Sequence, residues 1–371
     1  MRSPRTISPL RRVVTSVAAV VLATSLVSCS DGGASPTAST DFSTIAPTTT
    51  TRPATTTTET TIATTTTVEA TTTTQPAPPV YPLTGLLVGD PTVAARPALV
   101  VKIDNAGPAR PQTGFNAADV VFEEIVNDNL TRFAMVFQSG DSDPVGPIRS
   151  GRLQDIDLFS ALNHPLFAWS GGNATVTEAR RASELVDIGP NRAANGTYYR
   201  SGDRRKPHNL YSSTPALRAN TPFGAGPPAQ QFVYRIADEA PAGAPSPGVA
   251  MVLDSVDVRW DWDAASGLYF RTMENRPHFD AGTDTVVSTN NVVVLVTEYL
   301  PGISGSPDAQ TIGTGETMVF TGGTYIHGTW SRNDIHEPFR LVADDGEPIE
   351  LTPGRTFIEL PRPASTIPIP A

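Results

Sequence analysis

The sequence is poor in cysteine and lysine, and it contains no block of basic residues. Cys29 is the only cysteine among 371 residues, which excludes a disulfide framework within one chain, a cysteine-based zinc site and an iron–sulfur cluster. Lys102 and Lys206 are the only lysines among 27 basic residues, which face 37 acidic residues and leave a net charge of −10. Because an acidic chain without a basic block is a poor candidate for general nucleic-acid binding, we expect no nucleic-acid partner.

The usual signatures of hydrolases and nucleotide-binding proteins are also missing. The sequence contains no Gly-x-Ser-x-Gly, no His-Glu-x-x-His and no phosphate-binding loop. A lone histidine is more often a structural residue than a metal ligand. None of the five histidines has helical ligand spacing to another: His164, His208, His278, His327 and His336. We therefore expect neither a metal site nor a cofactor.

The N-terminus has the pattern of a lipoprotein signal. Residues 1–12 carry four arginines and no acid, and residues 13–27 form an apolar stretch that is short for a membrane span. Leu26-Val27-Ser28-Cys29 then resembles a bacterial lipobox. We expect residues 1–28 to be a signal peptide and Cys29 to carry acyl chains such as palmitate, which would anchor the protein at the outer face of the cell membrane. The alternative is an ordinary secretory signal with an incidental cysteine.

A low-complexity segment follows the lipobox and extends to residue 80. Threonine runs occupy 48–51, 55–58, 64–67 and 71–74, with prolines between them. Such a segment cannot bury enough apolar surface to offset the entropy lost on ordering it. We predict that residues 29–80 are the lipidated cysteine and a disordered, Thr-rich linker that holds the folded part away from the membrane.

The rest of the chain predicts an α+β fold that begins with a mixed α/β domain at 81–236. Its signals are short apolar runs, a β-hairpin around Asn127-Asp128-Asn129-Leu130 and two stretches of helical spacing. Strands are expected at 98–103, 119–126, 131–137 and 166–169, and helices at 153–162 and 175–186. A stretch without periodicity at 191–214 is predicted to be a long loop with a functional role.

A β-rich C-terminal domain is predicted at 248–362, after a Pro/Ala/Gly-rich linker at 237–247 and before a tail at 363–371. Strands are expected at 249–253, 256–262, 268–273, 291–298, 317–321, 324–330, 338–342 and 355–360. Gly322-Gly323 favours a tight hairpin. Gly313-Thr314-Gly315 lacks the third glycine of a nucleotide-binding loop and is predicted to be a turn.

A series of short motifs along the folded region resembles a known family. The motifs include Val101-Lys102-Ile103-Asp104-Asn105, Gly146-Pro147-Ile148-Arg149-Ser150-Gly151-Arg152, Arg205-Lys206-Pro207-His208-Asn209 and Pro277-His278-Phe279-Asp280. Together they resemble the YerB-like bacterial lipoproteins, whose two halves are both domains of unknown function. The resemblance covers about Arg96 to Leu360. It implies a cell-envelope lipoprotein and supplies no reaction.

The candidate site is a set of basic side chains in loops. Arginine suits the bidentate recognition of carboxylate or phosphate, and a basic cluster stands out electrostatically in an acidic chain. The predicted ligand-binding residues are Arg132, Arg149, Arg152, Arg205, Lys206 and His208. We expect Arg149, Arg152, Arg205 and His208 to meet at one face. Asp104 and Glu123, from neighbouring strand signals, are either acid–base groups or carboxylates that brace the arginines.

Two hypotheses for the function follow from this set. The first is a binding or interaction lipoprotein that holds an anionic wall component or a protein partner in a basic cleft. The second is an enzyme that acts on cell-wall polymer, with Glu123 or Asp104 as general acid or base. Convergence of the basic residues on an open cleft would favour ligand binding, whereas buried one-to-one pairing would favour bracing.

Overall fold

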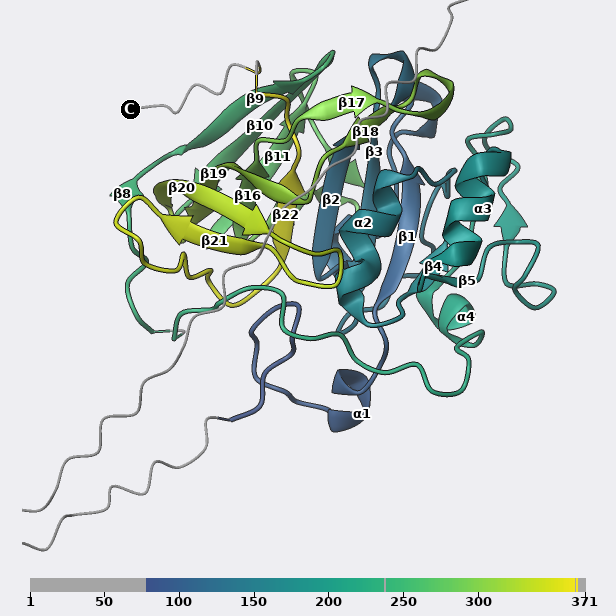
Figure 1. The fold of residues 1–371 in the computed structure, drawn as a ribbon, viewed down its shortest axis with the longest axis horizontal. Coiled ribbons are helices and arrows are strands. Elements are labelled where there is room, and N and C mark those ends of the chain that lie inside the picture. Colours follow the sequence, from purple (N-terminus) through teal and green to yellow (C-terminus); the bar gives the residue numbers. More distant parts are fainter. Residues whose placement is uncertain (1–77, 237, 364, 366–371) are drawn as a thin grey trace, which may run out of the picture. The chain divides into compact units, whose positions relative to one another are not determined.

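The computed structural model describes residues 78–236, 238–363 and 365, and a long mixed β-sheet runs through them (Figure 1). Its strands, in spatial order, are β21 (Arg340–Ala343), β20 (Thr324–Arg332), β19 (Gly313–Thr321), β16 (Asn291–Leu295), β22 (Thr356–Glu359), β2 (Val120–Ile125), β3 (Thr131–Phe137), β1 (Leu99–Asp104), β4 (Leu166–Ala168) and β5 (Val186–Asp187). An eleventh strand, β8 (Ala244–Pro245), pairs with β20.

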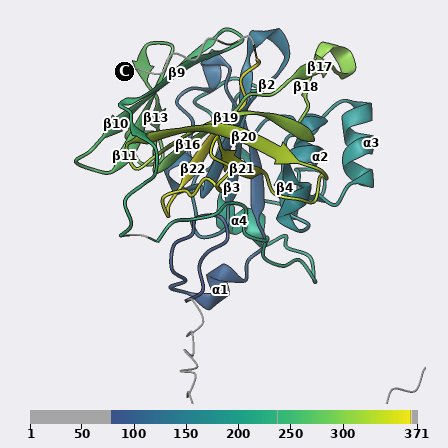
Figure 2. The ribbon, with the colours of Figure 1, turned by 60° about the vertical axis from the view of Figure 1, so that its left-hand side comes forward.

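A second sheet and three short ribbons complete the β structure. The second sheet is formed by β12 (Arg276–Pro277), β11 (Leu268–Met273), β10 (Val256–Asp263), β9 (Gly248–Leu253) and β15 (Ser288–Thr289). The ribbons pair β13 (Phe279–Asp280) with β14 (Thr285–Val286), β17 (Tyr299–Pro301) with β18 (Pro307–Ala309), and β6 (Tyr199–Arg200) with β7 (Leu210–Tyr211). Figure 2 shows the second sheet beside β16 and β22.

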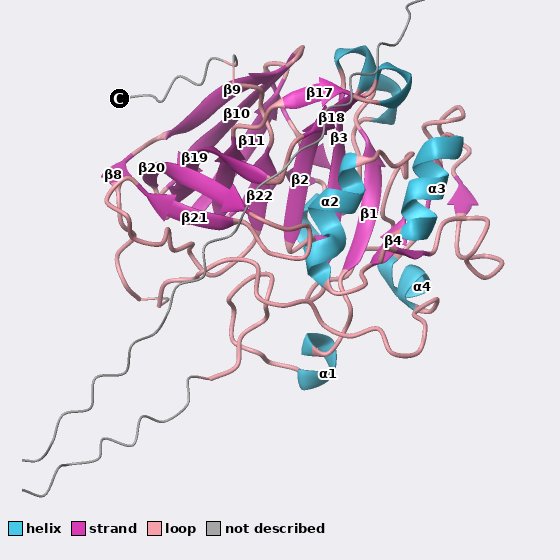
Figure 3. Ribbon diagram, viewed as in Figure 1, coloured by secondary structure: helices cyan, strands magenta, loops and turns pink. Residues whose placement is uncertain are grey.

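Helices are short, and most of them lie by the strands that the first half of the folded region contributes to the central sheet (Figure 3). The α-helices are α1 (Pro91–Ala94), α2 (Gln154–Phe159), α3 (Ala174–Ala182) and α4 (Thr214–Arg218). The 3-10 turns are η1 (Gly107–Ala109), η2 (Phe115–Ala117), η3 (Asn127–Asn129), η4 (Ser160–Leu162) and η5 (Ile303–Gly305).

The central sheet is covered on both faces, which explains why its middle strands are buried along their whole length. Successive side chains of a strand point to opposite faces. On β2, Phe122 packs edge-on against Phe159 of α2, with ring centroids 5.3 Å apart. On the opposite face, Trp260 of β10 packs against Phe357 of β22 at 4.8 Å. The core is therefore a helix layer, the central sheet and the second sheet.

Strand β22 joins the two halves of the folded region. It lies between β16 and β2 and is parallel to both. A strand from the second half of the folded region therefore lies in the middle of the sheet, next to a strand from the first half. The predicted α+β class is confirmed, with a mixed first half and a β-rich second half. The shared sheet is a feature that the local sequence patterns did not predict.

Most expected strands are present, and two local predictions are wrong. The hairpin of 119–126 and 131–137 forms as β2 and β3, and Gly322-Gly323 connects β19 to β20. The helix expected at 175–186 ends at Ala182, because the Ser183 hydroxyl donates to the Arg180 carbonyl at 2.7 Å and the chain turns into β5. The turn expected at Gly313-Thr314-Gly315 is instead the beginning of β19.

Candidate functional site

The predicted site residues gather because of the direction of the strands. β1, β4 and β5 are parallel, and β2 has the same direction because β3 is antiparallel to both β1 and β2. Their carboxyl ends and the amino end of β3 therefore meet at one edge. Open α/β sheets bind ligands at this kind of edge. Asp104 ends β1, Arg132 lies at the start of β3, and Trp169 follows β4.

Asp104 brings together two of the predicted basic loops. Its Oδ2 atom lies 3.1 Å from Arg149 Nε and 2.7 Å from His208 Nδ1. Its Oδ1 atom accepts a hydrogen bond from the backbone N–H of Ala106 at 3.1 Å. The Asp104 carboxylate is almost buried, whereas the side chains of Arg149 and His208 are 26% and 20% exposed. The carboxylate thus orients a guanidinium and an imidazole that both reach solvent.

Arg132 and Arg152 lie next to this cluster. Arg132 donates from Nη1 to the Ser150 carbonyl at 2.9 Å, and Arg152 donates from Nη2 to Asn127 Oδ1 at 2.8 Å. Burial, together with the charges of Arg152 and Arg149, lowers the pKa of Arg132 to about 9. Burial also lowers the pKa of Arg152, with a smaller opposing effect from Asp155. The arginines are therefore close enough to repel one another.

A buried ion cluster supports this edge from below. The Lys102 ammonium contacts the carboxylates of Glu124 and Asp155, the latter at 2.7 Å, and all three side chains are buried. Asp155 also accepts the backbone N–H of Arg152 at 2.6 Å. Burial lowers the pKa of Lys102 to about 8, and Asp155 opposes the shift. Lys102 thus fixes the loop that presents Arg149 and Arg152.

Arg205 and Lys206 do not join the cluster. Both lie exposed in the turn between β6 and β7, and neither side chain has a hydrogen bond or ion pair with the described residues. The turn itself is held by Arg204, which donates to the carbonyls of Ala109 and Pro111, the latter at 2.7 Å. Of the four residues expected to meet, Arg149, Arg152 and His208 lie together, and the side chain of Arg205 lies apart from them.

Glu123 belongs to a different network, on the opposite face of the sheet. Its carboxylate contacts the Arg271 guanidinium and the Thr131 hydroxyl, and Asn105 donates to it at 3.3 Å. Glu123 and Arg271 have no exposed surface. A carboxylate without a route to solvent cannot meet a polymer, so the geometry supports the bracing role for Glu123 and not the acid–base role.

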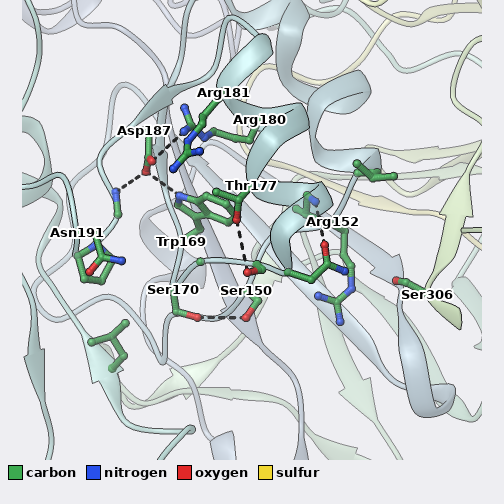
Figure 4. Close-up of a pocket in the computed structure, with 18 of the residues that line it drawn as sticks. Ser150, Arg152, Trp169, Ser170, Thr177, Arg180, Arg181, Asp187, Asn191 and Ser306 are labelled. Carbon is green, nitrogen blue, oxygen red and sulfur yellow. Dashed lines mark hydrogen bonds and ion pairs between the residues drawn. The ribbon is translucent and has the colours of Figure 1, made fainter. Parts of the chain in front are cut away.

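A large basic pocket opens beside the Asp104 cluster, with a volume of about 840 Å³ (Figure 4). Its walls come from α3, from the loops around β4 and β5, from β6, and from the turn between β17 and β18. Five arginines and two aspartates line it: Arg152, Arg180, Arg181, Arg192, Arg200, Asp187 and Asp308. Hydroxyl groups of Ser150, Ser170, Thr177 and Ser306 add neutral donors. We call this cavity the basic pocket.

One of the two acids in the basic pocket is already neutralised. Asp187 accepts the indole N–H of Trp169 at 2.7 Å and the backbone N–H of Gly189 at 2.9 Å, and Arg180 lies 3.1 Å from its other oxygen. The Arg180 guanidinium also lies over the Trp169 ring, 6.0 Å from its centroid. By contrast, Arg192 is exposed and its side chain has no hydrogen bond or ion pair with the described residues. The pocket therefore has surplus positive charge.

The sequence analysis predicted Arg152 and missed the other lining arginines. Those residues belong to α3, to the loop after β5 and to β6, which come together only in the fold. One signal could have found them. Gly171-Gly172 separates a short apolar strand from a helix, and a glycine-containing loop between strand and helix is where α/β proteins place anion sites. Asn173 caps that helix by accepting the Val176 N–H at 2.9 Å.

Other site classes find no support in the described part of the chain. No group of three or more His, Cys, Asp or Glu side chains is arranged to hold a metal ion there. No helix within those residues is long and apolar enough to cross a membrane. Cys29 and most of the predicted linker lie outside the described residues, so the lipidation prediction is not tested by the fold.

Comparison with known proteins identifies the family. The N-terminal domain of a protein family of unknown function, DUF3048, matches residues 83–223, and the C-terminal domain of the same family matches residues 249–358. The protein named "Putative lipoprotein YerB" from Bacillus subtilis (strain 168) is 25% identical over 291 residues, which span 75% of this chain and 85% of the relative.

A solved structure has the same fold. The crystal structure of the YerB protein from Bacillus subtilis superimposes with a TM-score of 0.69 at 21% identity, covering 78% of this chain and 99% of that one. At this identity, the superposition shows the fold alone. The two domain matches cover most of the folded region. The chain therefore belongs to the YerB-like lipoprotein family, in which both domains are of unknown function.

Proposed function

We propose that this chain is a lipoprotein, anchored through acylated Cys29 at the outer face of the cell membrane, that binds an anionic component of the cell envelope. The printed name of its Bacillus relative and the lipobox at Leu26-Val27-Ser28-Cys29 support the anchor. The linker predicted at 29–80 would let the folded part reach the cell wall. Two acyl chains are enough for stable membrane anchoring, whereas one is marginal.

The basic pocket is the observation that carries the binding role. Five arginines line a cavity of about 840 Å³ in a chain whose net charge is −10. Volumes of this size accommodate ligands larger than a single phosphate or acetate. Arginine forks match the geometry of phosphate and carboxylate groups, and the serine and threonine hydroxyls supply further donors. An anionic ligand would offset the surplus positive charge.

The enzyme alternative has less support from the geometry. Glu123 is fully buried against Arg271, and the Asp104 carboxylate is occupied by Arg149, His208 and Ala106. A general acid or base must reach the proton that it transfers within hydrogen-bond distance. Glu123 has no exposed surface and Asp104 very little, so the geometry favours a binding protein.

A calorimetric titration of the full-length protein with inorganic triphosphate tests the basic pocket. Arg181 and Arg192 are exposed and little used in folding, since Arg181 only approaches Glu178 at 3.5 Å. The double variant Arg181→Gln/Arg192→Gln should bind triphosphate at least about tenfold more weakly. Arg276→Gln/Arg340→Gln removes the same charge from exposed positions in the second half and should bind normally. Equal weakening by both pairs would mean a diffuse charge effect and no pocket.

The anchor has its own test. Cys29→Ser should release the protein from the membrane fraction or leave its signal uncleaved, because residues 1–28 alone do not predict a full membrane span. Fractionation of cells followed by mass determination of the N-terminus measures both outcomes. A Cys29→Ser protein that is still processed and still membrane-bound would refute lipid anchoring.

A further inference from the structure

Several cations lie close together at the carboxyl edge. Four cations, Lys102, Arg132, Arg149 and Arg152, lie around three buried carboxylates, Asp104, Glu124 and Asp155, and the exposed Asp128 also acts on Arg152. Arg149 contributes to the lowered pKa of both Arg132 and Arg152, so its charge acts on each of them. A cluster of like charges costs free energy unless an anion offsets it. Arg149 thus carries its charge among other cations, where a further negative group would lower the electrostatic free energy.

Two groups of this cluster are accessible and have nitrogen atoms without a partner among the described residues. The Arg149 guanidinium is fixed only through Nε, and its Nη atoms have no partner among the described residues. His208 is fixed through Nδ1, and its Nε2 atom likewise has no partner within that part of the chain. In the imidazolium form, Nε2 can donate to an anion. Because Asp104 holds both side chains through one oxygen atom, their free nitrogens are oriented together. An orienting carboxylate of this kind reduces the conformational cost of binding.

The two loops that carry these side chains both reach the basic pocket. Ser150 follows Arg149 in the chain, lines the pocket and approaches the Ser170 hydroxyl at 3.4 Å. On the other side, Asn209 follows His208 and accepts a hydrogen bond from the pocket residue Arg200 at 2.8 Å. The loops of the Asp104 cluster and the basic pocket are thus neighbours, and Figure 4 shows Ser150 and Ser170 together in the wall of the pocket.

We propose that Arg149 and His208, oriented by Asp104, form a second oxyanion subsite that extends the basic pocket, and that the ligand is a linear polyanion. This inference rests on the proposed function, because it assumes that the basic pocket holds an anion. A single small anion would occupy one of the two places. A chain with oxyanions at repeated positions, either phosphodiesters or carboxylates, would occupy both at once and gain affinity from the linkage.

A purely structural role for the Asp104 cluster is less consistent with its surroundings. The β6–β7 hairpin is already held to the sheet, because Ile148 N–H donates to the Leu210 carbonyl at 2.6 Å. Arg204 adds hydrogen bonds to the Ala109 and Pro111 carbonyls. The Arg149 and His208 contacts are therefore not needed to keep the hairpin in place, and removing them should leave the fold intact.

Calorimetric titration of the full-length protein compares three probes: inorganic triphosphate, long-chain polyphosphate and poly-L-glutamate. The wild-type protein should bind at least one polymer about tenfold or more tightly, per site, than triphosphate. The double variant Arg149→Gln/His208→Gln should lose that advantage and keep its affinity for triphosphate. Arg205→Gln/Lys206→Gln removes two exposed cations from the same hairpin and should keep the advantage. The preferred polymer distinguishes phosphate from carboxylate recognition.

The possible results separate the two proposals. If the wild-type protein binds triphosphate and the polymers equally, or if Arg149→Gln/His208→Gln keeps the polymer advantage, the second subsite is wrong and the basic pocket stands. If no probe binds, the proposed function itself fails. Should the double variant unfold, Arg149→Lys serves instead, because it keeps the charge and loses the fork; a retained advantage in a folded Arg149→Lys variant would overturn the subsite.

Discussion

Glu123 and Glu359 lie where strands from the two halves of the folded region pair, and their proximity favours the protonated form of Glu359. The two residues are paired in register on adjacent strands, and both are fully buried. They share one cation, Arg271, whose Nη2 contacts Glu123 and whose Nε lies 3.7 Å from Glu359. Burial raises the pKa of Glu359 well above its usual value, and the charge of Glu123 raises it further. The Glu359 carboxyl therefore keeps its proton to a higher pH than an ordinary glutamate.

This raised pKa fixes a pH dependence of stability. A group whose pKa is raised on folding stabilises the protein fully below its unfolded pKa, here 4.5, and loses that contribution as pH rises through the folded pKa. Glu359→Gln is always neutral and can still accept the Trp260 indole N–H. Its unfolding free energy should therefore rise relative to wild type as pH increases above about 4.5, by at most about 1.4 kcal/mol per pH unit.

Urea unfolding between pH 5 and pH 8 measures the difference. Glu123→Gln is the informative contrast, because it leaves the buried Arg271 without its closest partner and should cost about 3–5 kcal/mol across the range. Glu350→Gln changes an exposed glutamate and should show no such trend. A Glu359→Gln difference that stays constant with pH would mean that Glu359 holds no extra proton.

At the scale of elements, β19 shows why a glycine pair was misinterpreted. Gly315 lies in β19 opposite Trp330 of β20. A Cβ atom at Gly315 would come within 2.5 Å of Trp330 Nε1 and 2.7 Å of the Val296 carbonyl. The Trp330 indole uses that space to donate to the same carbonyl at 3.0 Å. Gly315 therefore makes room for a tryptophan across the hairpin and does not form a turn.

Gly315→Ala should accordingly lower the unfolding free energy by about 1–3 kcal/mol, the usual cost of inserting atoms into a packed place. Gly89→Ala is a suitable control, since no atom lies within 4 Å of the Cβ position there; it should change stability by less than about 0.5 kcal/mol. Thermal or urea unfolding measures both. A neutral Gly315→Ala variant would show that Trp330 does not need the glycine.

Local patterns were sufficient for elements that are defined by their neighbours in sequence. The hairpin around Asn127-Asp128-Asn129-Leu130 and the apolar runs at β1 and β4 were predicted close to their bounds. Elements that depend on partners distant in sequence were not predicted. β5 forms because Val186 donates to the Pro165 carbonyl at 2.9 Å and pairs with β4, and the helical spacing of 175–186 contains no sign of that pairing.

At the scale of the whole folded region, the position of β22 makes the two halves interdependent. β22 covers the edge of β2, and Arg271 from the second half neutralises Glu123 of the first. Residues 78–236 expressed alone should therefore lack a cooperative unfolding transition, because an open β2 edge and an unpaired buried carboxylate are both destabilising. Calorimetry of residues 78–236, with residues 78–363 as the comparison, checks this prediction. A sharp unfolding transition in the shorter chain would contradict it.

The part of the candidate site that comes from local motifs could be predicted from the sequence, and the part that comes from packing could not. Asp104, Arg149 and His208 belong to motifs that stand out in the sequence, and the strand directions bring them together. The basic pocket adds Arg180 and Arg192, which lie outside those motifs and meet the others only through the packing of α3 and the loop after β5. No local pattern contains that packing.

Binding of the full-length protein to purified cell walls tests the central claim, that the basic pocket holds an anionic envelope component. Cosedimentation should retain the wild-type protein and the Arg276→Gln/Arg340→Gln control, and should release Arg181→Gln/Arg192→Gln, whose two changes lie in the pocket. Retention of the pocket variant to the same extent as wild type, with its fold intact, would contradict the account.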